Sequence, residues 1–278
     1  MGLGSPVVIL YDANGNVLVG QKTAANSIPV VLASDVTVAV TTSPSGAVPT
    51  LAFGDITLAA ITTAAIRRTT YTEQAANFTG SIASANANDA AAGTGARTVR
   101  IYWMNAAGSS VGTEDVTLNG TTGVNLVTTT KCFIEKIEVL TAGSGGVAAG
   151  IISLYTGANK TGTVVGTIAA GDNNTFWAHH YVLSGKTANV TGMLFGTTVT
   201  NSAGVSNGFL RAIALPVSSS VDKQVSDGIT VAGVSSSSVF RSYGSQIQVA
   251  GPARIAMYVT TSNGSSFVYR GSFDSYDL

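Results

Sequence analysis

The stretch Thr98-Val-Arg-Ile-Tyr-Trp103 decides the fold class, because its side chains alternate in character along the chain. Val99, Ile101 and Trp103 fall on one face, whereas the residues between them are polar or amphipathic. A period of two residues is typical of a β-strand that buries one face and exposes the other. The stretch therefore predicts a strand of a sheet that has one buried face and one exposed face.

The same pattern recurs along most of the chain, and turn signals rich in Gly and Asn separate the repeats. Strand-like segments lie at 115–118, 136–139, 151–155, 163–168, 175–183, 189–195, 209–217, 228–231, 246–249, 253–260 and 267–273. The helix–strand alternation that is typical of a parallel sheet does not occur. Residues 77–278 are therefore predicted to form an all-β fold, an antiparallel β-sandwich or jelly roll.

The N-terminal residues have a different pattern, and we expect an extended docking arm over residues 1–50. Two short apolar runs around Asn14-Gly15 predict a small hairpin, which is not stable in water by itself. Pro29 interrupts the next apolar run and favours an edge strand or an extended segment. The arm should therefore become ordered against its own domain or a neighbouring subunit. Residues 51–76 are predicted to be a linker with a short helix or strand.

The composition argues against catalysis. The 278 residues include one cysteine, two histidines and about 10% charged residues, so few acids, bases or nucleophiles are available for an active site. The single cysteine, Cys132, lies in a strand-like run and is interpreted as a small buried apolar residue. We therefore expect a protein that is not an enzyme and holds no cofactor.

The charge balance also restricts the partners. Fourteen basic residues balance fourteen acidic residues, and Arg67-Arg68 is the only basic pair, which predicts no nucleic-acid partner. No apolar run approaches the roughly 18 residues of a membrane span, so no membrane partner is expected. A neutral surface suits a subunit packed in an assembly, although a soluble neutral monomer has the same composition.

Two glycine-rich segments match enzyme motifs without the structural context that those motifs need. Gly204-Val-Ser-Asn-Gly208 matches G-x-S-x-G, but a strand-like run follows it where a hydrolase has a helix. We interpret this segment as a hairpin loop. Gly143-Ser-Gly-Gly-Val-Ala148 matches a dinucleotide fingerprint and is again followed by a strand-like run. It is interpreted as a turn between strands.

The adjacent histidines His179 and His180 suggest a metal site, but neighbouring side chains on a strand point to opposite faces. One histidine is expected to pack in the core with a hydrogen bond, and the other to face a partner. A metal shared between subunits is the alternative. Trp177, His179 and Tyr181 share one face, which predicts a contact patch across a subunit interface.

Oxygen-rich loops at 86–89 and 171–174 could hold calcium, but Asn and Asp clusters mostly mark turns. A pair of carboxylates for glycoside cleavage is a minor alternative, because glutamate is scarce. The four glutamates are Glu73, Glu114, Glu135 and Glu138. No metal site is therefore predicted.

Several blocks together resemble a known family. Residues 22–35, Lys-Thr-Ala-Ala-Asn-Ser-Ile-Pro-Val-Val-Leu-Ala-Ser-Asp, resemble an N-terminal motif of tailed-bacteriophage virion proteins. Residues 88–99, 116–122, 176–182 and 243–255 are similar to blocks in a family of phage virion structural proteins. The resemblance spans nearly the whole chain.

The resemblance implies a structural component of the virion, assembled in the host cytoplasm as a head decoration or a head or neck fibre. Its partners would be capsid, neck or tail proteins and copies of itself, with a trimer favoured. A tail or baseplate fibre that binds a receptor or glycan is the alternative. The residues expected to dock in the arm are Ile28, Pro29, Val30, Val31, Leu32 and Asp35.

Overall fold

The computed structural model describes residues 48–58, 62–199, 204–215, 222–226, 228–233, 237–261 and 267–278. The arm predicted over residues 1–50 therefore lies outside the described residues, except for its last three. Its docking residues Ile28, Pro29, Val30, Val31, Leu32 and Asp35 lie outside them as well. In the part that the structure describes, the fold is all-β with antiparallel sheets, as the sequence predicts, and no helix there is long and apolar enough to cross a membrane.

The chain forms seventeen strands and one short 3₁₀ turn within these residues. The strands are β1 (Val48–Leu58), β2 (Thr63–Ala65), β3 (Ser81–Ser84), β4 (Ala96–Met104), β5 (Val111–Thr117), β6 (Val124–Asn125), β7 (Phe133–Ala142), β8 (Ile152–Tyr155), β9 (Val164–Ile168), β10 (His179–Val182), β11 (Thr187–Val199), β12 (Gly204–Ala214), β13 (Asp222–Gln224), β14 (Ile229–Gly233), β15 (Ser237–Ala250), β16 (Ala253–Thr261) and β17 (Phe267–Asp277). The 3₁₀ turn, Ala158–Lys160, precedes β9.

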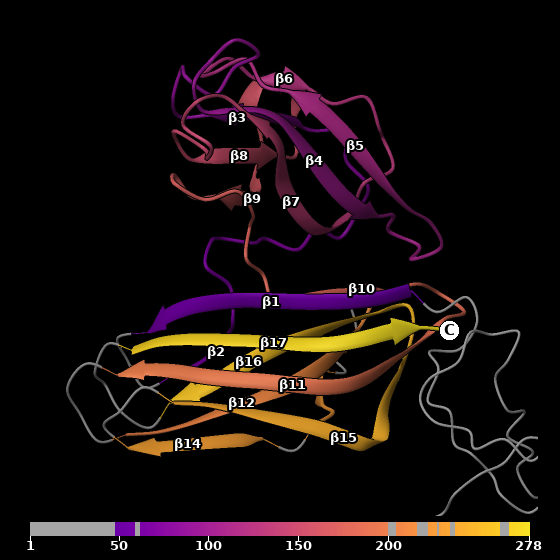
Figure 1. The fold of residues 1–278 in the computed structure, drawn as a ribbon. Coiled ribbons are helices and arrows are strands. Elements are labelled where there is room, and N and C mark those ends of the chain that lie inside the picture. The colour runs from indigo at the N-terminus through magenta and orange to yellow at the C-terminus, as the bar shows by residue number, and fades with distance from the viewer. Residues whose placement is uncertain are drawn as a thin grey trace, which may run out of the picture. The chain divides into compact units, whose positions relative to one another are not determined.

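One sandwich is built from strands at the two ends of the described chain (Figure 1). Its first sheet has the order β1-β17-β11-β15, and its second has the order β10-β16-β12-β13, with β14 paired to β12 and β2 paired to β16. Alternate side chains of both sheets fill the core between them, as the period of two requires. The largest contributors are Met193 and Phe195 from β11, Met257 from β16, and Tyr269 and Phe273 from β17.

A second sandwich is formed by the strands between β2 and β10, with sheets β6-β3-β8-β9 and β5-β4-β7. Val99 and Ile101 of β4 lie in its core, as the sequence predicts. Trp103 is only half-buried, and Met104 is buried instead. The reason is a register shift between Tyr102 and Trp103 against β7, which interrupts the alternation.

The second sandwich is inserted into the first, and the two ends of the insertion lie side by side. The amide N–H of Ala178 donates to the main-chain oxygen of Ile66 at 3.0 Å, and Arg67 pairs with Trp177 in an isolated bridge. The sequence predicts a single sandwich over 77–278, whereas the sheets divide these residues between two. Strand patterns in the two sandwiches are alike, so the sequence does not show which strands share a sheet.

The segment predicted as a linker, 51–76, contains two strands of the first sandwich. β1 pairs with β17 along its whole length, and β2 pairs with β16. Ala52 and Gly54 point into the sandwich, and Leu51 and Phe53 point away from it. A Cβ atom on Gly54 would lie 2.6 Å from the main-chain oxygen of Phe176, so only glycine allows this close approach.

Of the two glycine-rich motifs, one prediction is confirmed and one is wrong. The segment 143–148 is a turn between β7 and β8, and Gly146 has a positive φ of 72°. The segment 204–208 is not a loop but the first half of β12, paired with β14. There the missing side chain of Gly208 leaves room for the ring of Phe195, 2.4 Å from where a Cβ would lie.

The second sandwich also buries charge. Lys131 is fully buried, and its Nζ donates to the Glu114 carboxylate at 2.7 Å and to the main-chain oxygen of Thr128. Burial alone would raise the pKa of Glu114, but hydrogen bonds from Lys131 and from the N–H of Val127 outweigh it and hold the pKa below its usual value. The neighbouring thiol of Cys132 is buried, as predicted, which raises its pKa to about 11.

Glu114→Gln should lower the free energy of unfolding by about 3 kcal/mol, because it leaves the buried ammonium of Lys131 without a counter-charge. Denaturant titration followed by circular dichroism measures this change. The matched control is Asp115→Asn on the adjacent residue, whose carboxylate pairs with Arg100 in solvent. The control should unfold like the parent chain. Equal effects of the two substitutions would contradict the importance of the buried pair.

Candidate functional site

Strand β10 and the residue pair before it supply side chains to both cores. Trp177 and Tyr181 belong to the core of the second sandwich, and Ala178 and Val182 belong to the core of the first. The prediction that Trp177, His179 and Tyr181 share a face is confirmed. All three are less than 5% exposed, however, so they are not available for the subunit contact that the sequence predicts. The contact they make is internal, between two parts of one chain.

His179 is a buried structural histidine. Its Nε2–H donates to the main-chain oxygen of Glu135 at 2.8 Å, and its ring makes edge contacts with Tyr71 and Tyr181. Burial lowers its pKa well below the usual value, and the charges of Arg67 and Arg254 lower it further. The ring therefore stays neutral, and its packing confirms the expectation that one histidine is held in the core by a hydrogen bond.

A buried cluster of two tyrosines, one carboxylate and the guanidiniums of Arg67 and Arg254 surrounds this histidine. The hydroxyls of Tyr71 and Tyr181 are hydrogen-bonded to each other, and Tyr181 donates to the Glu73 carboxylate at 3.2 Å. Arg254 Nη1 donates to the second oxygen of Glu73. Burial raises the pKa of Tyr181 well above its usual value, so both phenols remain protonated. Within this cluster Glu73 and Arg254 neutralise each other, which suits a structural role.

His180 joins the two sandwiches. Its Nδ1–H faces Glu135 Oε1 of β7 at 3.2 Å, and its Nε2–H faces both oxygens of Asp277 of β17 at 3.1 Å. Burial alone would lower the pKa of His180, but the two carboxylates outweigh it and raise the pKa to about 10. The sequence predicts that the second histidine faces a partner, whereas His180 is held by two carboxylates of its own chain.

The raised pKa of His180 has a testable consequence for stability. Its folded pKa of about 10 exceeds the ordinary 6.5, so its stabilising effect is complete below about pH 6.5 and is lost as the pH rises towards 10. The unfolding free energy should fall by about 3 kcal/mol between pH 6.5 and 9. His180→Asn should remove this slope, and His179→Gln should keep it.

Proton NMR tests the same assignment directly, because His179 and His180 are the only histidines in the chain. One ring signal should titrate near pH 10, and the other should stay in its neutral position throughout. Two rings that titrate near pH 6.5 would show that Glu135 and Asp277 do not hold His180 between them, an arrangement called the carboxylate clamp below.

The oxygen-rich loops are used by the fold itself. The Asp89 carboxylate is fully buried and accepts four hydrogen bonds, from the Ser84 hydroxyl and from the N–H groups of Ala96, Ala149 and Gly150. Asp172 in the second loop is paired with Arg68 at 2.6 Å. Across the residues that the structure describes, no group of three His, Cys, Asp or Glu residues could hold a metal ion.

The carboxylates that could serve in glycoside cleavage are bound in the same way. Glu114 is paired with Lys131, and Glu135 accepts from His180 and from the N–H of Tyr181. Glu138 accepts from Lys136 and from the Tyr102 hydroxyl. With Glu73 held by Arg254, each glutamate has a partner within the fold. The four glutamates are thus bound within the fold.

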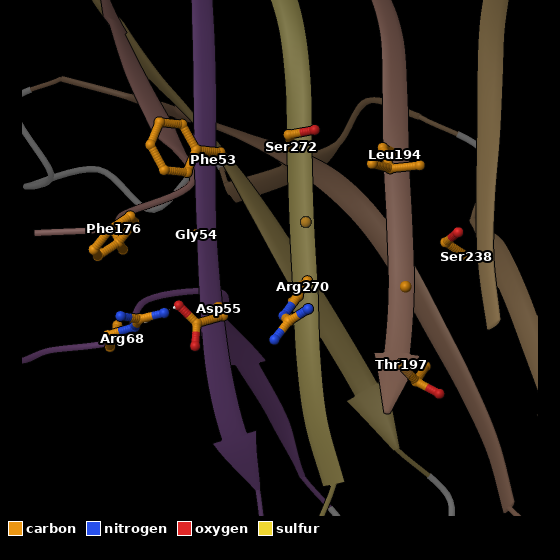
Figure 2. Close-up of a pocket in the computed structure, with 12 residues that line it drawn as sticks. Phe53, Gly54, Asp55, Arg68, Phe176, Leu194, Thr197, Ser238, Arg270 and Ser272 are labelled. Atoms are coloured by element: carbon orange, nitrogen blue, oxygen red, sulfur yellow. Dashed lines mark hydrogen bonds and ion pairs between the residues drawn. The ribbon is translucent and has the colours of Figure 1, made fainter. Parts of the chain in front are cut away.

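A surface cavity of about 540 Å³ lies on the side of sheet β1-β17-β11-β15 that faces away from the first core. Figure 2 shows Phe53, Ser272 and Leu194 in line across β1, β17 and β11, with Asp55 and Arg270 in the next row. Apolar and small side chains therefore make most of its floor. The sequence predicts no site here, because it assigns Leu51 and Phe53 to a linker.

The wall of this cavity beyond β1 is built from Arg68 and Phe176. The guanidinium of Arg68 lies 4.2 Å from the centre of the Phe176 ring and is paired with Asp55 at 2.7 Å. Phe176 makes an edge contact with Phe53, and it has a positive φ of 49°. A bulky residue in this region is strained by about 1–3 kcal/mol, so the surrounding contacts must hold it.

A second cavity, of about 610 Å³, borders both sandwiches. Tyr102, Trp103 and Val111 line one side, and Glu135 and Lys186 line another. The buried indole N–H of Trp103 has no hydrogen-bond partner among the described residues. The cavity therefore combines aromatic rings with the charged residues Glu135 and Lys186.

Comparison with known proteins gives only weak likenesses. No family model and no curated protein matches the chain. Among solved structures, it is similar to a chain of the T13 particle of infectious bursal disease virus, with 10% identity over 83% of this chain and 69% of that chain and a TM-score of 0.28. The Gx strain of this virus gives 10% identity, 83% and 72% coverage, and a TM-score of 0.26. Scores this low carry no argument about this chain.

Proposed function

We propose that the chain is a non-enzymatic structural component of a tailed-phage virion, a head decoration or a head or neck fibre. The observation that carries the proposal is the contrast between its interior and one of its surfaces. Its histidines and glutamates are bound inside the fold, whereas Leu51, Phe53, Leu194 and Phe240 are exposed on one sheet. Exposed apolar patches of this kind mark interaction surfaces. The sequence resemblance to phage virion proteins supports the same assignment.

In this proposal the N-terminal arm attaches the chain to another virion protein, either in the capsid, the neck or the tail. Ile28, Val30 and Leu32 alternate with Pro29 and Val31, so an extended arm would present three apolar side chains on one side. Main-chain hydrogen bonds of an added strand would supply affinity, and these side chains would supply specificity. Homo-oligomers, for which the resemblance favours a trimer, would gain avidity from several arms.

The chain should be present in many copies in purified particles of the phage that encodes it, assembled in the host cytoplasm. Mass spectrometry of gradient-purified particles measures the number of copies of the chain relative to the major capsid protein. Cryo-electron microscopy of the same particles gives the position. Its absence from particles, combined with abundance in the infected cell, would contradict the proposal.

Val30→Asp should reduce incorporation into particles by at least about tenfold, because a charge would be buried where the arm docks. Quantitative mass spectrometry of particles assembled with the variant measures the loss. The matched control is Ala25→Asp, which adds the same charge outside the apolar run. If both variants enter particles at the parent level, the apolar run does not dock.

A second candidate function, a receptor- or glycan-binding fibre of the tail or baseplate, is favoured by the second cavity. Aromatic rings beside polar groups are a common way to hold a sugar, and Tyr102 and Trp103 line this cavity together with Glu135 and Lys186. A glycan array probed with the full chain tests this function. Binding that Trp103→Phe abolishes would support it, and an array without binding would count against it.

A further inference from the structure

We propose that the outer face of sheet β1-β17-β11-β15 pairs with the same face of a second copy of this chain, about a two-fold axis. The outer face is defined by four side chains that point away from the first core, Leu51, Phe53, Leu194 and Phe240, and by the residues in register between them. The inference rests on the homo-oligomer in the proposed function and names the surface that forms it.

The first argument is an apolar row that crosses the whole sheet. Strand register places Phe53 opposite Ser272, Ser272 opposite Leu194, and Leu194 opposite Phe240, so one row spans all four strands. The three apolar side chains are each at least 40% exposed. Such a row is costly in water and is stabilised when an apolar surface covers it.

The second argument is the charge pattern on either side of this row. On β17, Arg270 and Asp274 lie two residues before and two residues after Ser272, and both are exposed. Neither makes an ion pair with any other described residue. An axis that runs along the row reverses the strand direction between the two copies. It therefore brings Arg270 over the partner's Asp274 and, by symmetry, Asp274 over the partner's Arg270.

The acidic residue in register with Arg270 on the neighbouring strand does not compete for it. Asp55 is the register partner of Arg270, but its carboxylate is held by Arg68 at 2.7 Å. Figure 2 shows Arg68 and Asp55 together at β1, with Arg270 on the next strand. The wall made by Arg68 and Phe176 thus leaves Arg270 available to a partner of opposite charge.

The third argument is the small residues that flank the row on β11. Gly192 lies in the row of Asp274, and Gly196 lies in the row of Arg270. The same axis places Gly192 over the partner's Gly196, so in these three rows Leu194 is the only side chain of this strand that projects towards the partner. The ring of Phe240 already lies over Gly192, 2.9 Å from where a Cβ would be. A closely approaching second sheet would complete this packing.

The face is also large enough to form a stable contact. β1 has 11 residues. At about 3.4 Å per residue, and with four strands about 4.8 Å apart, the face measures about 37 by 19 Å, or about 700 Å². A standard specific interface buries about 800 Å² on each partner. Two copies packed face to face would therefore approach that size.

The test measures the mass of the full chain by sedimentation across a concentration series. Arg270→Glu and Asp274→Arg should each halve the mass and weaken association by more than about tenfold, because like charges would face each other twice. The double variant Arg270→Glu/Asp274→Arg restores opposite charges and should restore the parent mass. If the chain also trimerises through another surface, the mass falls from six copies to three instead of from two to one.

Lys223→Glu is the matched control, because it makes the same charge change on β13 in the other sheet. It should keep the parent mass, and all variants should keep the parent's circular dichroism. Three results would overturn the inference: a parent chain that stays monomeric, a double variant that does not recover, or a control that dissociates as well. A monomeric chain that is nevertheless abundant in particles would refute the pairing and leave the proposed function intact.

Discussion

The structure depends on the two-sided use of β10. Successive side chains of a strand point to opposite faces, and here each face belongs to a different hydrophobic core. Trp177 and Tyr181 enter one core, and Ala178 and Val182 enter the other. A change that shifted the register of β10 by one residue would exchange these sets and damage both cores at once. The clamp on His180 adds an electrostatic link at the same position.

Charge and apolar surface are distributed in an unusual way for so neutral a chain. Lys131, Arg254 and His180 are buried and paired with carboxylates, whereas bulky apolar side chains remain on the outer face. Buried ion pairs contribute little net stability but are costly to disrupt, so they favour one arrangement over others. These three buried charges thus act within the fold, where they favour one arrangement of the strands.

The sequence predicts what depends on local pattern. Val99 and Ile101 lie in a core as their alternation indicates, and Cys132 is buried. The sequence does not show how strands are divided between cores, because alternation is the same in either sandwich. It misses β1 because the residues that alternate with Leu51 and Phe53 are the small Ala52 and Gly54. The need for glycine at position 54 comes from its close approach to the main chain of Phe176 and Ile66, which are distant in the sequence. The candidate face was missed for the same reason, since its rows exist only once four separate strands are in register.

The adjacent ends of the inserted sandwich have an evolutionary consequence. Ile66 and Ala178 are hydrogen-bonded to each other, and the strands next to them, β2 and β10, both pair with β16. The second sandwich is therefore inserted between two residues that are neighbours in the first sandwich. Recombination could exchange such a module without altering the pairing of the remaining strands. The aromatic side chains that Trp177 and Tyr181 contribute would then limit which replacements are tolerated. Only inserted sandwiches whose core has room for those two rings would be accepted at this position.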